Sequence, residues 1–281
     1  MMVHTNTKPK RENMNYNIKS NILFKEWLSN ASKILPVAEC MYIARSLFEI
    51  DVIDPNLILP KACQIALDWV LYLRTQNTPL AKIIEKKYFH DHCFHTNEHT
   101  LDPRCETEAL LENVSIKPRT ILELGIGTGC VILSAMKIYP KALGLGIDIS
   151  ENALKVAEHN AAILKIKRIE FKQNNWAHGI KGHFDLIFAN PPYVPRTATL
   201  NQETLHDPEL ALFGDAKTYE EMFKSMKDID FYEMLIEIPQ NLVSEVETML
   251  KQKIISHHSY TFSPIFDSQI FVLKIENTRN F

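Results

Sequence analysis

The second half of the chain alternates short apolar runs with segments of helical period, and this alternation restricts the fold more than any other feature. Six runs are typical of strands: 119–124, 142–148, 168–173, 184–189, 231–238 and 269–275. Several are apolar almost throughout, as expected for strands that are covered on both faces. Helical segments separate the first three, and Ser150 is placed to cap one of them. This order predicts an α/β domain with a mainly parallel sheet over residues 104–281.

The first third of the chain has a different texture. Residues 20–87 carry apolar side chains at helical spacing, with Leu23, Trp27, Ala31 and Ile34 on one face. Prolines at 36, 55, 60 and 79 stand where helices would begin or end, which predicts a small helical bundle. Residues 88–103 predict a β-hairpin linker with its turn at 96–98. Residues 1–19 predict a disordered basic tail, with a cleaved targeting peptide as the alternative.

Composition excludes several classes of protein. The chain has 281 residues, 46% hydrophobic and 23% charged, as in an ordinary globular protein. Its formal net charge of −3 creates no global field that would attract nucleic acid. The five cysteines are odd in number and form no CxxC pair, which favours a reducing compartment. No apolar run reaches about 18 residues, so we expect no membrane span. These features predict a cytoplasmic protein, and we expect a monomer.

A glycine-rich turn, LELGIGTGC, follows the first strand of the predicted sheet. Gly125, Gly127 and Gly129 allow a tight turn that brings the backbone close to a ligand. A nicotinamide-binding motif would need glycine at position 130, which is Cys130, so that spacing fails. The pattern with Glu123 before it is typical instead of enzymes that bind S-adenosylmethionine. A plain tight turn without a ligand is the alternative.

Two further residues fit the same cofactor. Asp148 ends the second strand about twenty residues after the glycines, where folds of this kind present a carboxylate to a ribose diol. Trp176 follows the third strand and offers a flat apolar surface to an adenine ring. The alternatives are that Asp148 only caps the next helix and that Trp176 is a core residue.

The strand at 184–189 ends in Asn190-Pro191-Pro192-Tyr193, a stiff turn that carries one amide and one aromatic ring. A primary amide or an arylamine is a poor nucleophile because its lone pair is delocalised. Two rigid acceptors, Asn190 Oδ1 and the Pro191 carbonyl, would hold its N–H hydrogens and aim the lone pair at a methyl donor. Tyr193 could pack against the flat group. The turn therefore predicts a planar NH2 substrate, with a proline-rich exit loop as the alternative.

The order of these segments resembles the release-factor glutamine N5-methyltransferases (PrmC/HemK type) over roughly residues 78–240. The similar segments are TPLAKIIEKKYF, LDPRCETEALLE, LELGIGTG, GIDIS-ENAL, QNNW, NPPYVP, DPELALFGDAKTYEEMF and IEIPQ. The resemblance implies a seven-stranded, Rossmann-like class I methyltransferase domain behind an N-terminal helical bundle. It also implies an enzyme that methylates the glutamine of the Gly-Gly-Gln motif in peptide chain release factors, with S-adenosylmethionine as cofactor. Because residues 20–87 carry no chemical motif, we expect the bundle to bind the protein substrate.

The resemblance also implies roles for individual residues. The cofactor would contact Gly125, Ile126, Gly127, Thr128, Gly129, Asp148, Trp176 and Asn190. The glutamine would be held by Asn190, Pro191, Pro192 and Tyr193, with Asn190, Pro191 and Tyr193 as the catalytic set. The chain departs from the family pattern at Asn175, Cys105, Phe213, Ala216 and Pro239.

Other readings of the sequence stay open. His90, His92, Cys93 and His95 are potential metal donors, but their spacing is not that of a tetrahedral site, so no metal is expected. A nucleic-acid adenine N6-methyltransferase also uses Asn-Pro-Pro-Tyr, on a flipped base, but would normally carry a basic surface. A non-catalytic protein that binds the cofactor or serves as a scaffold is the third reading.

Overall fold

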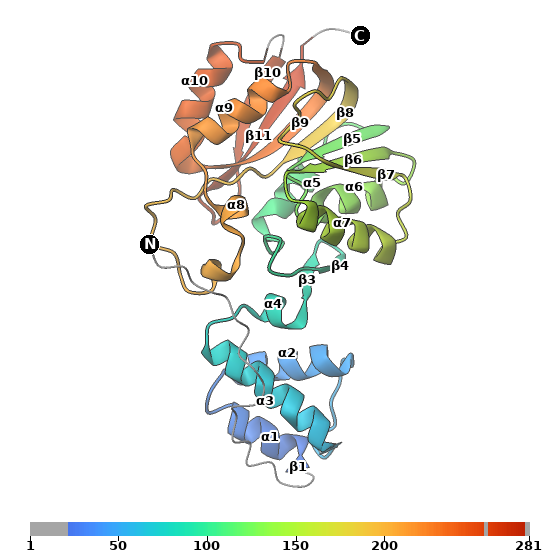
Figure 1. Ribbon diagram of the computed structural model, residues 1–281, viewed down its shortest axis with the longest axis vertical. Helices are drawn as coiled ribbons and strands as arrows, with labels where there is room; N and C mark the ends of the chain where they lie inside the picture. The colour runs from blue at the N-terminus through green and yellow to red at the C-terminus, as the bar shows by residue number, and fades with distance from the viewer. Residues whose placement is uncertain (1–21, 256–257, 279–281) are drawn as a thin grey trace. The chain divides into compact units, whose positions relative to one another are not determined.

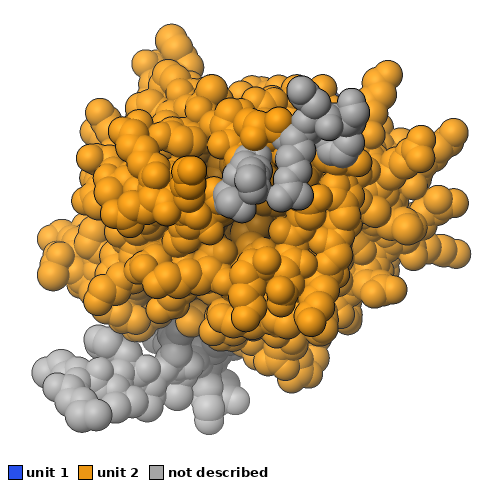
Figure 2. Space-filling model, turned by 90° about the horizontal axis from the view of Figure 1, so that it is seen from above, with its two compact units in different colours: residues 1–84 blue, residues 85–281 orange. Residues whose placement is uncertain are grey.

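The computed structural model describes residues 22–255 and 258–278, which form two compact units, residues 1–84 and 85–281. The second unit is drawn in orange in Figure 2, where its side chains form one continuous surface. The unit boundary lies three residues before the expected end of the helical bundle. The expected tail at residues 1–19 lies outside the described residues.

The first unit is a small helical bundle with its own core. Its helices are α1 (Phe24–Ala31), α2 (Val37–Phe48), α3 (Lys61–Thr75) and α4 (Leu80–Ile84), and the short strands β1 (Ile22–Leu23) and β2 (Ile58–Leu59) pair antiparallel. Pro36 and Pro60 directly precede α2 and α3, as predicted. The core includes Phe24, Trp27 and Ile43, whereas Ile34, which was expected on the same helical face as Trp27, lies beyond the end of α1 and is exposed.

The second unit is built on a seven-stranded sheet in the order β10-β11-β9-β8-β5-β6-β7. Its strands are β5 (Thr120–Leu124), β6 (Leu143–Asp148), β7 (Ile169–Gln173), β8 (Gly182–Ala189), β9 (Ile229–Pro239), β10 (His258–Pro264) and β11 (Ile270–Asn277). β5 to β9 run parallel, whereas β11 runs antiparallel to both of its neighbours. Because β6 and β8 flank β5, the chain reverses direction across the sheet there. Such a switch point places a crevice at the strands' carboxyl ends.

Both faces of the sheet are covered by helices. One face is covered by α5 (Ala109–Glu112), α6 (Cys130–Ile138) and α7 (Glu151–Ile163), and the other by α9 (Ala216–Ser225) and α10 (Val243–Lys251) (Figure 1). Alternate residues of each central strand enter opposite cores: Leu186 and Phe188 face α6, whereas Ile187 and Ala189 face α9. The seven-stranded α/β fold confirms the predicted fold class, and Ser150 caps α7 as predicted.

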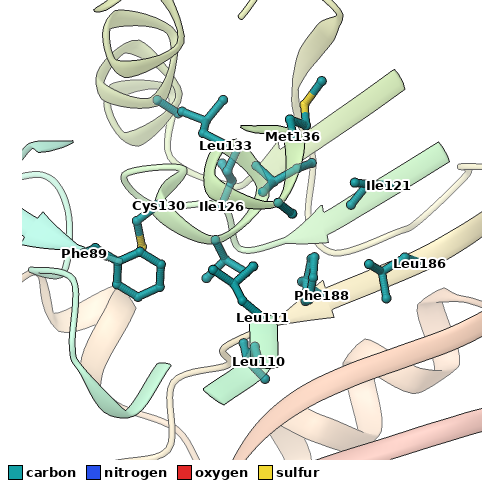
Figure 3. Close-up of a cluster of buried hydrophobic side chains, with 14 of the residues drawn as sticks. Phe89, Leu110, Leu111, Ile121, Ile126, Cys130, Leu133, Met136, Leu186 and Phe188 are labelled. Carbon is teal, nitrogen blue, oxygen red and sulfur yellow. The ribbon is translucent and has the colours of Figure 1, made fainter. Parts of the chain in front are cut away.

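A dense apolar cluster lies directly behind the glycine turn. Figure 3 shows Ile126 and Cys130 at its centre, with the Phe89 ring beside Cys130 and Leu111 below them. α6 is buried from Cys130 to Met136, so it has little freedom to move. Tight packing of this kind fixes the turn that precedes the helix.

One local expectation was wrong. The predicted hairpin has its turn at His90–Asp91 and not at 96–98, since β3 (Lys86–Phe89) pairs with β4 (His92–His95). His90 supplies the left-handed conformation (φ 50°) that this tight turn requires. Phe89 and Phe94 bury the hairpin in the second unit, so residues 96–103 continue as a loop. Within the described ranges no helix is both long and apolar enough to cross a membrane.

Candidate active site

The carboxyl ends of β5, β6 and β8 open into a cavity of about 490 Å³, within the range of small-molecule sites. Its walls combine the glycine turn, the segments after β6, β7 and β8, and the loops at 98–107 and 208–221. Seven of the predicted cofactor residues line it: Gly125, Ile126, Gly127, Thr128, Asp148, Trp176 and Asn190. The fold therefore gathers segments that are far apart in the sequence around one space.

The glycine turn is held by backbone hydrogen bonds to the next strand. The amides of Gly125 and Ile126 both donate to the Ile147 carbonyl, at 2.8 and 2.9 Å. Gly125, Gly127 and Gly129 all have left-handed φ values between 53° and 77°, which only glycine adopts at little cost. Gly129 is the predicted residue that does not line the cavity. It caps α6 and packs against Leu133 and Ala157.

The side chain of Asn160 ties the glycine turn to the hairpin. Its Nδ2 donates to the carbonyls of Thr128 and His95, both at 2.9 Å, and its Oδ1 accepts from the His95 amide at 2.7 Å. Asn160 is fully buried, so these bonds act away from water. Nothing in its helical context in the sequence distinguishes this asparagine from a surface residue.

Asp148 organises the turn and keeps acceptor capacity for a ligand. Its Oδ2 accepts from the Gly127 amide and its Oδ1 from the Ser150 amide, both at 2.9 Å. The two carboxylate oxygens together offer four acceptor sites, so the group keeps acceptor capacity for a hydroxyl of a ribose. Trp176 lies beside the glycine turn, because a Cβ on Gly125 would stand 3.8 Å from Trp176 Cζ3, and both Trp176 and Asp148 line the cavity. The carboxylate, the aromatic ring and the cavity volume all fit S-adenosylmethionine.

We expect Asp148→Ala to weaken binding of S-adenosylmethionine by about 1.5–3 kcal/mol, the range for hydrogen bonds to a charged group. The variant also loses the bond that holds the Gly127 amide. Isothermal calorimetry measures the affinity, and circular dichroism checks that the variant is folded. Asp91→Ala, which removes an exposed carboxylate of the hairpin turn, serves as control. Equal affinities for the two variants would remove Asp148 from the cofactor site.

Glu123 is a buried carboxyl at the base of the cavity. It is 3% exposed, and its Oε2 accepts from the Ile132 amide at 2.9 Å. Burial is the main cause that raises its pKa from 4.5 to about 8, while the bond from Ile132 opposes the rise. At neutral pH this side chain is therefore mainly protonated, unlike most glutamates.

This raised pKa gives a testable dependence of stability on pH. Between pH 4.5 and about 8 the folded chain binds a proton at Glu123 that the unfolded chain has released. The free energy of unfolding therefore falls as the pH rises through this window. Glu123→Gln keeps an acceptor for the Ile132 amide but has no carboxyl to titrate. We expect its free energy of unfolding, measured by urea denaturation, to fall less steeply with pH across the same window. Parallel pH profiles for the two proteins would contradict this assignment.

The Asn190–Tyr193 turn presents only part of itself to the cavity. Asn190 and Pro192 line the cavity, whereas Pro191 is buried and does not. The Tyr193 hydroxyl donates to Glu237 Oε1 at 3.0 Å, so this ring supports the turn from behind. Burial, and next the charge of Glu237, raise the pKa of Tyr193, which keeps its phenol protonated. The predicted roles of Pro191 and Tyr193 stay predictions.

Residues 194–218 pack back onto this turn. Val194, which directly follows the turn, makes two backbone hydrogen bonds with the returning chain. Its amide donates to the Leu212 carbonyl at 2.9 Å, and its carbonyl accepts from the Gly214 amide at 3.1 Å. Phe213, which departs from the family pattern, lines the cavity, and the Arg196 guanidinium lies 5.1 Å from its ring centre. Arg104 pairs with the buried Asp207 carboxylate at 2.8 Å, linking the two loops at the cavity rim.

Two residues that reasoning from the sequence missed complete the site. Thr107 lines the cavity and is bonded to Asn190, and Glu237 lies buried behind both. Both belong to segments that resemble the family, but nothing in their spacing pairs residues so far apart. In the part of the chain that the structure describes, no group of three or more His, Cys, Asp or Glu residues could hold a metal ion.

Comparison with known proteins places the chain in a family. The family model described as "Methyltransferase domain" matches residues 117–263, more than half of the chain. A release factor glutamine methyltransferase of Rhodospirillum rubrum is 37% identical over 171 residues, covering 58% of this chain and 52% of that protein. One of Agrobacterium fabrum is 41% identical over 155 residues, covering 50% and 53%. The chain spans only between about half and two thirds of the relatives' own lengths.

Solved structures share the fold at low identity. The catalytic domain of hMettl16, solved with an RNA hairpin, gives a TM-score of 0.53 at 8% identity, covering 86% of this chain and 92% of that one. At this identity the likeness concerns the fold alone. Sheet order, cavity and matched family all indicate the same enzyme class: the chain belongs to the methyltransferase domain family, and its cofactor is S-adenosylmethionine.

Proposed function

We propose that this protein transfers a methyl group from S-adenosylmethionine to the side-chain amide nitrogen of a glutamine in the Gly-Gly-Gln motif of peptide chain release factors. The observation that carries the proposal is the position of Asn190, whose side chain lines the cofactor cavity at the end of β8. Relatives named release factor glutamine methyltransferase, at 33–41% identity, support this choice of substrate. We propose that the protein works as a cytoplasmic monomer and contacts no nucleic acid.

The chain's own residues do most of the work by positioning. The bound cofactor supplies an activated methyl group on a positively charged sulfur. Asn190 Oδ1 accepts a hydrogen bond from the glutamine NH2, which draws the nitrogen lone pair out of amide resonance and directs it into the cavity. Pro192 stiffens the turn, and Gly214 packs directly against the Pro192 carbonyl. Well-oriented reactants of this kind can account for about 7–11 kcal/mol of a barrier. The transfer would form one N–C bond and break the S–CH3 bond of the cofactor, whose electron pair stays on sulfur so that S-adenosylhomocysteine leaves as a neutral thioether, and one N–H proton of the amide would pass to solvent.

Mass spectrometry tests the proposal directly. Purified protein is incubated with S-adenosylmethionine and a release factor, and the tryptic peptide that contains Gly-Gly-Gln is analysed. We expect this peptide to gain one methyl group, located on the glutamine side chain by fragmentation. Methylation of an adenine in DNA or RNA, with the glutamine unmodified, would establish the nucleic-acid reading instead. If neither substrate gains a methyl group, the non-catalytic reading holds.

We also propose that the first unit binds the protein substrate. It carries exposed apolar side chains, including Val52 (81% exposed), Ile58 (57%) and Val37 (53%). Exposed apolar side chains of this kind can mark a protein-binding surface.

Removal of residues 1–84 should therefore raise the KM for a release factor and leave the affinity for S-adenosylmethionine near normal. Each compact unit has its own core, so the second unit is expected to fold without the first. Steady-state kinetics with an intact release factor gives the KM, and calorimetry gives the cofactor affinity. A short Gly-Gly-Gln peptide is the control, because its KM should not change. An unaltered KM for the intact factor would remove this role from the first unit.

A further inference from the structure

A buried carboxyl lies behind the Asn190 turn. Glu237, near the end of β9, is 2% exposed. Its Oε2 accepts from Thr107 Oγ1 at 2.6 Å, and its Oε1 accepts from the Tyr193 hydroxyl at 3.0 Å. Burial is the main cause that raises the pKa of Glu237, and hydrogen bonds from Thr107, Tyr193 and Asn190 oppose the rise. The carboxyl is thus surrounded by donors that belong to the loops around the cavity.

The directions of these hydrogen bonds fix the orientation of Asn190. The Thr107 hydroxyl donates its single hydrogen to Glu237 Oε2. Thr107 Oγ1 can then only accept from its other neighbour, which lies 3.2 Å away and must be Asn190 Nδ2. The Asn190 amide therefore points its NH2 group inward. Among the described residues no partner occupies its Oδ1, which is available to a donor in the cavity.

We propose that Glu237 and Thr107 are positioning residues, which hold the Asn190 amide in the orientation that accepts an N–H group and excludes a carbonyl. This inference deepens the proposed function and rests on it, because the selected group is the NH2 of the glutamine side chain. A flipped Asn190 would present its own NH2 to the cavity and hold the oxygen of the substrate amide. The nitrogen would then face away from the methyl group.

A matched pair of variants at Thr107 tests whether its hydroxyl holds the Asn190 amide in place. Thr107→Val removes the hydroxyl with little change of shape, whereas Thr107→Ser keeps it. We expect Thr107→Val to lower kcat for methylation of a Gly-Gly-Gln peptide about tenfold or more, the effect of leaving one buried polar group unpaired. Thr107→Ser should retain kcat near that of the natural chain. Calorimetric affinity for S-adenosylmethionine should be unchanged in both, since neither change touches the glycine turn or Asp148.

Glu237→Gln provides a second, independent variant. A glutamine offers one acceptor and one donor where the carboxylate accepts from both hydroxyls, so one of the bonds must reverse or break. We expect the kcat of Glu237→Gln to fall. In the double variant Thr107→Val, Glu237→Gln, the fold-reduction in kcat should be smaller than the product of the fold-reductions in the two single variants. Equal kcat for the valine and serine variants would overturn the inference. A loss of cofactor affinity as large as the loss in kcat would also overturn it, as it would indicate a general structural role.

A readout that needs no substrate separates this inference from the proposed function. In protein labelled with ¹⁵N-asparagine, the Nδ2 signals of Asn190 are identified by their loss in Asn190→Ala. We expect slow solvent exchange of these protons in the natural chain and in Thr107→Ser, and faster exchange in Thr107→Val and Glu237→Gln. This pattern supports the inference even if no glutamine is methylated. Identical exchange in all four proteins would overturn it, whether or not glutamine is methylated.

Discussion

Replacing Asn190 with alanine is expected to abolish methyl transfer to the Gly-Gly-Gln peptide while cofactor binding is largely kept. The alanine removes the Oδ1 acceptor but leaves the glycine turn, Asp148 and Trp176 in place. An acceptor that matters most in the transition state affects kcat far more than binding. Removing one preorganised group of this kind typically costs about 10²- to 10³-fold in kcat. Mass spectrometry gives the product yield, and calorimetry gives the affinity for S-adenosylmethionine.

A second asparagine controls for the general effect of losing an amide. Asn201 lies on an exposed loop and does not line the cavity, and its side chain accepts from the amide and the hydroxyl of Thr204. We expect Asn201→Ala to keep full transfer. If Asn190→Ala retains kcat within a few-fold of Asn201→Ala, Asn190 does not orient the substrate, and the mechanism proposed for this turn is wrong.

Gly214→Ala is expected to lower the rate of methyl transfer by displacing the Asn190–Tyr193 turn, although Gly214 does not line the cavity. A Cβ at this position would stand 1.9 Å from the Pro192 carbonyl oxygen and 2.6 Å from its carbon. Both are backbone atoms, so the clash cannot be relieved by rotating a side chain. The Asn190–Tyr193 turn must therefore shift, and overpacking of this kind costs about 1–3 kcal/mol of stability. Because displacement by about 1 Å can lower a rate about 10²-fold, transfer should fall more steeply than stability does.

Gly179→Ala is the matched control, because it introduces backbone strain without a steric clash. Gly179 has φ +74° but no atom within 4 Å of an added Cβ. We expect this variant to lose about 1–2 kcal/mol of stability from the left-handed conformation and to keep its transfer rate. Thermal denaturation and peptide kinetics measure the two quantities. Normal transfer by a folded Gly214→Ala protein would show that the turn tolerates displacement.

The sequence predicted the features that depend on neighbouring residues. Alternating apolar runs located β5, β6, β7, β8, β9 and β11, and the glycine spacing located a turn that lines the cavity. The strand β10 was not predicted, because its sequence HSYTFSP alternates polar with aromatic residues and lies half-exposed at the sheet edge. The hairpin turn was misplaced because His90 and Asp91 carry no glycine, the usual signal for a left-handed turn residue.

The supporting residues of the site depend on the order of the strands, which local patterns do not encode. Thr107 and Glu237 are 130 positions apart, and they meet only because α5 covers the face of the sheet from which Glu237 projects. Before the fold is known, a glutamate within an apolar strand reads as a solvent-facing residue. Likewise, the contact of Gly214 with Pro192 depends on a loop that returns to the turn it left. Tertiary packing alone creates these pairs.

The place of β11 in the sheet has a consequence for synthesis of the protein on the ribosome. This strand is the last in sequence order, yet it lies between β9 and β10 and buries Val272, Leu273 and Ile275. Until residues 270–277 leave the exit tunnel, the edge of β9 that pairs with β11 keeps unpaired backbone N–H and C=O groups along Met234, Leu235 and Ile236. Open edges of apolar strands promote aggregation of nascent chains. A frameshift or stop codon shortly before residue 270 would therefore produce an insoluble polypeptide, although the methyl-transfer cavity is encoded entirely upstream of it.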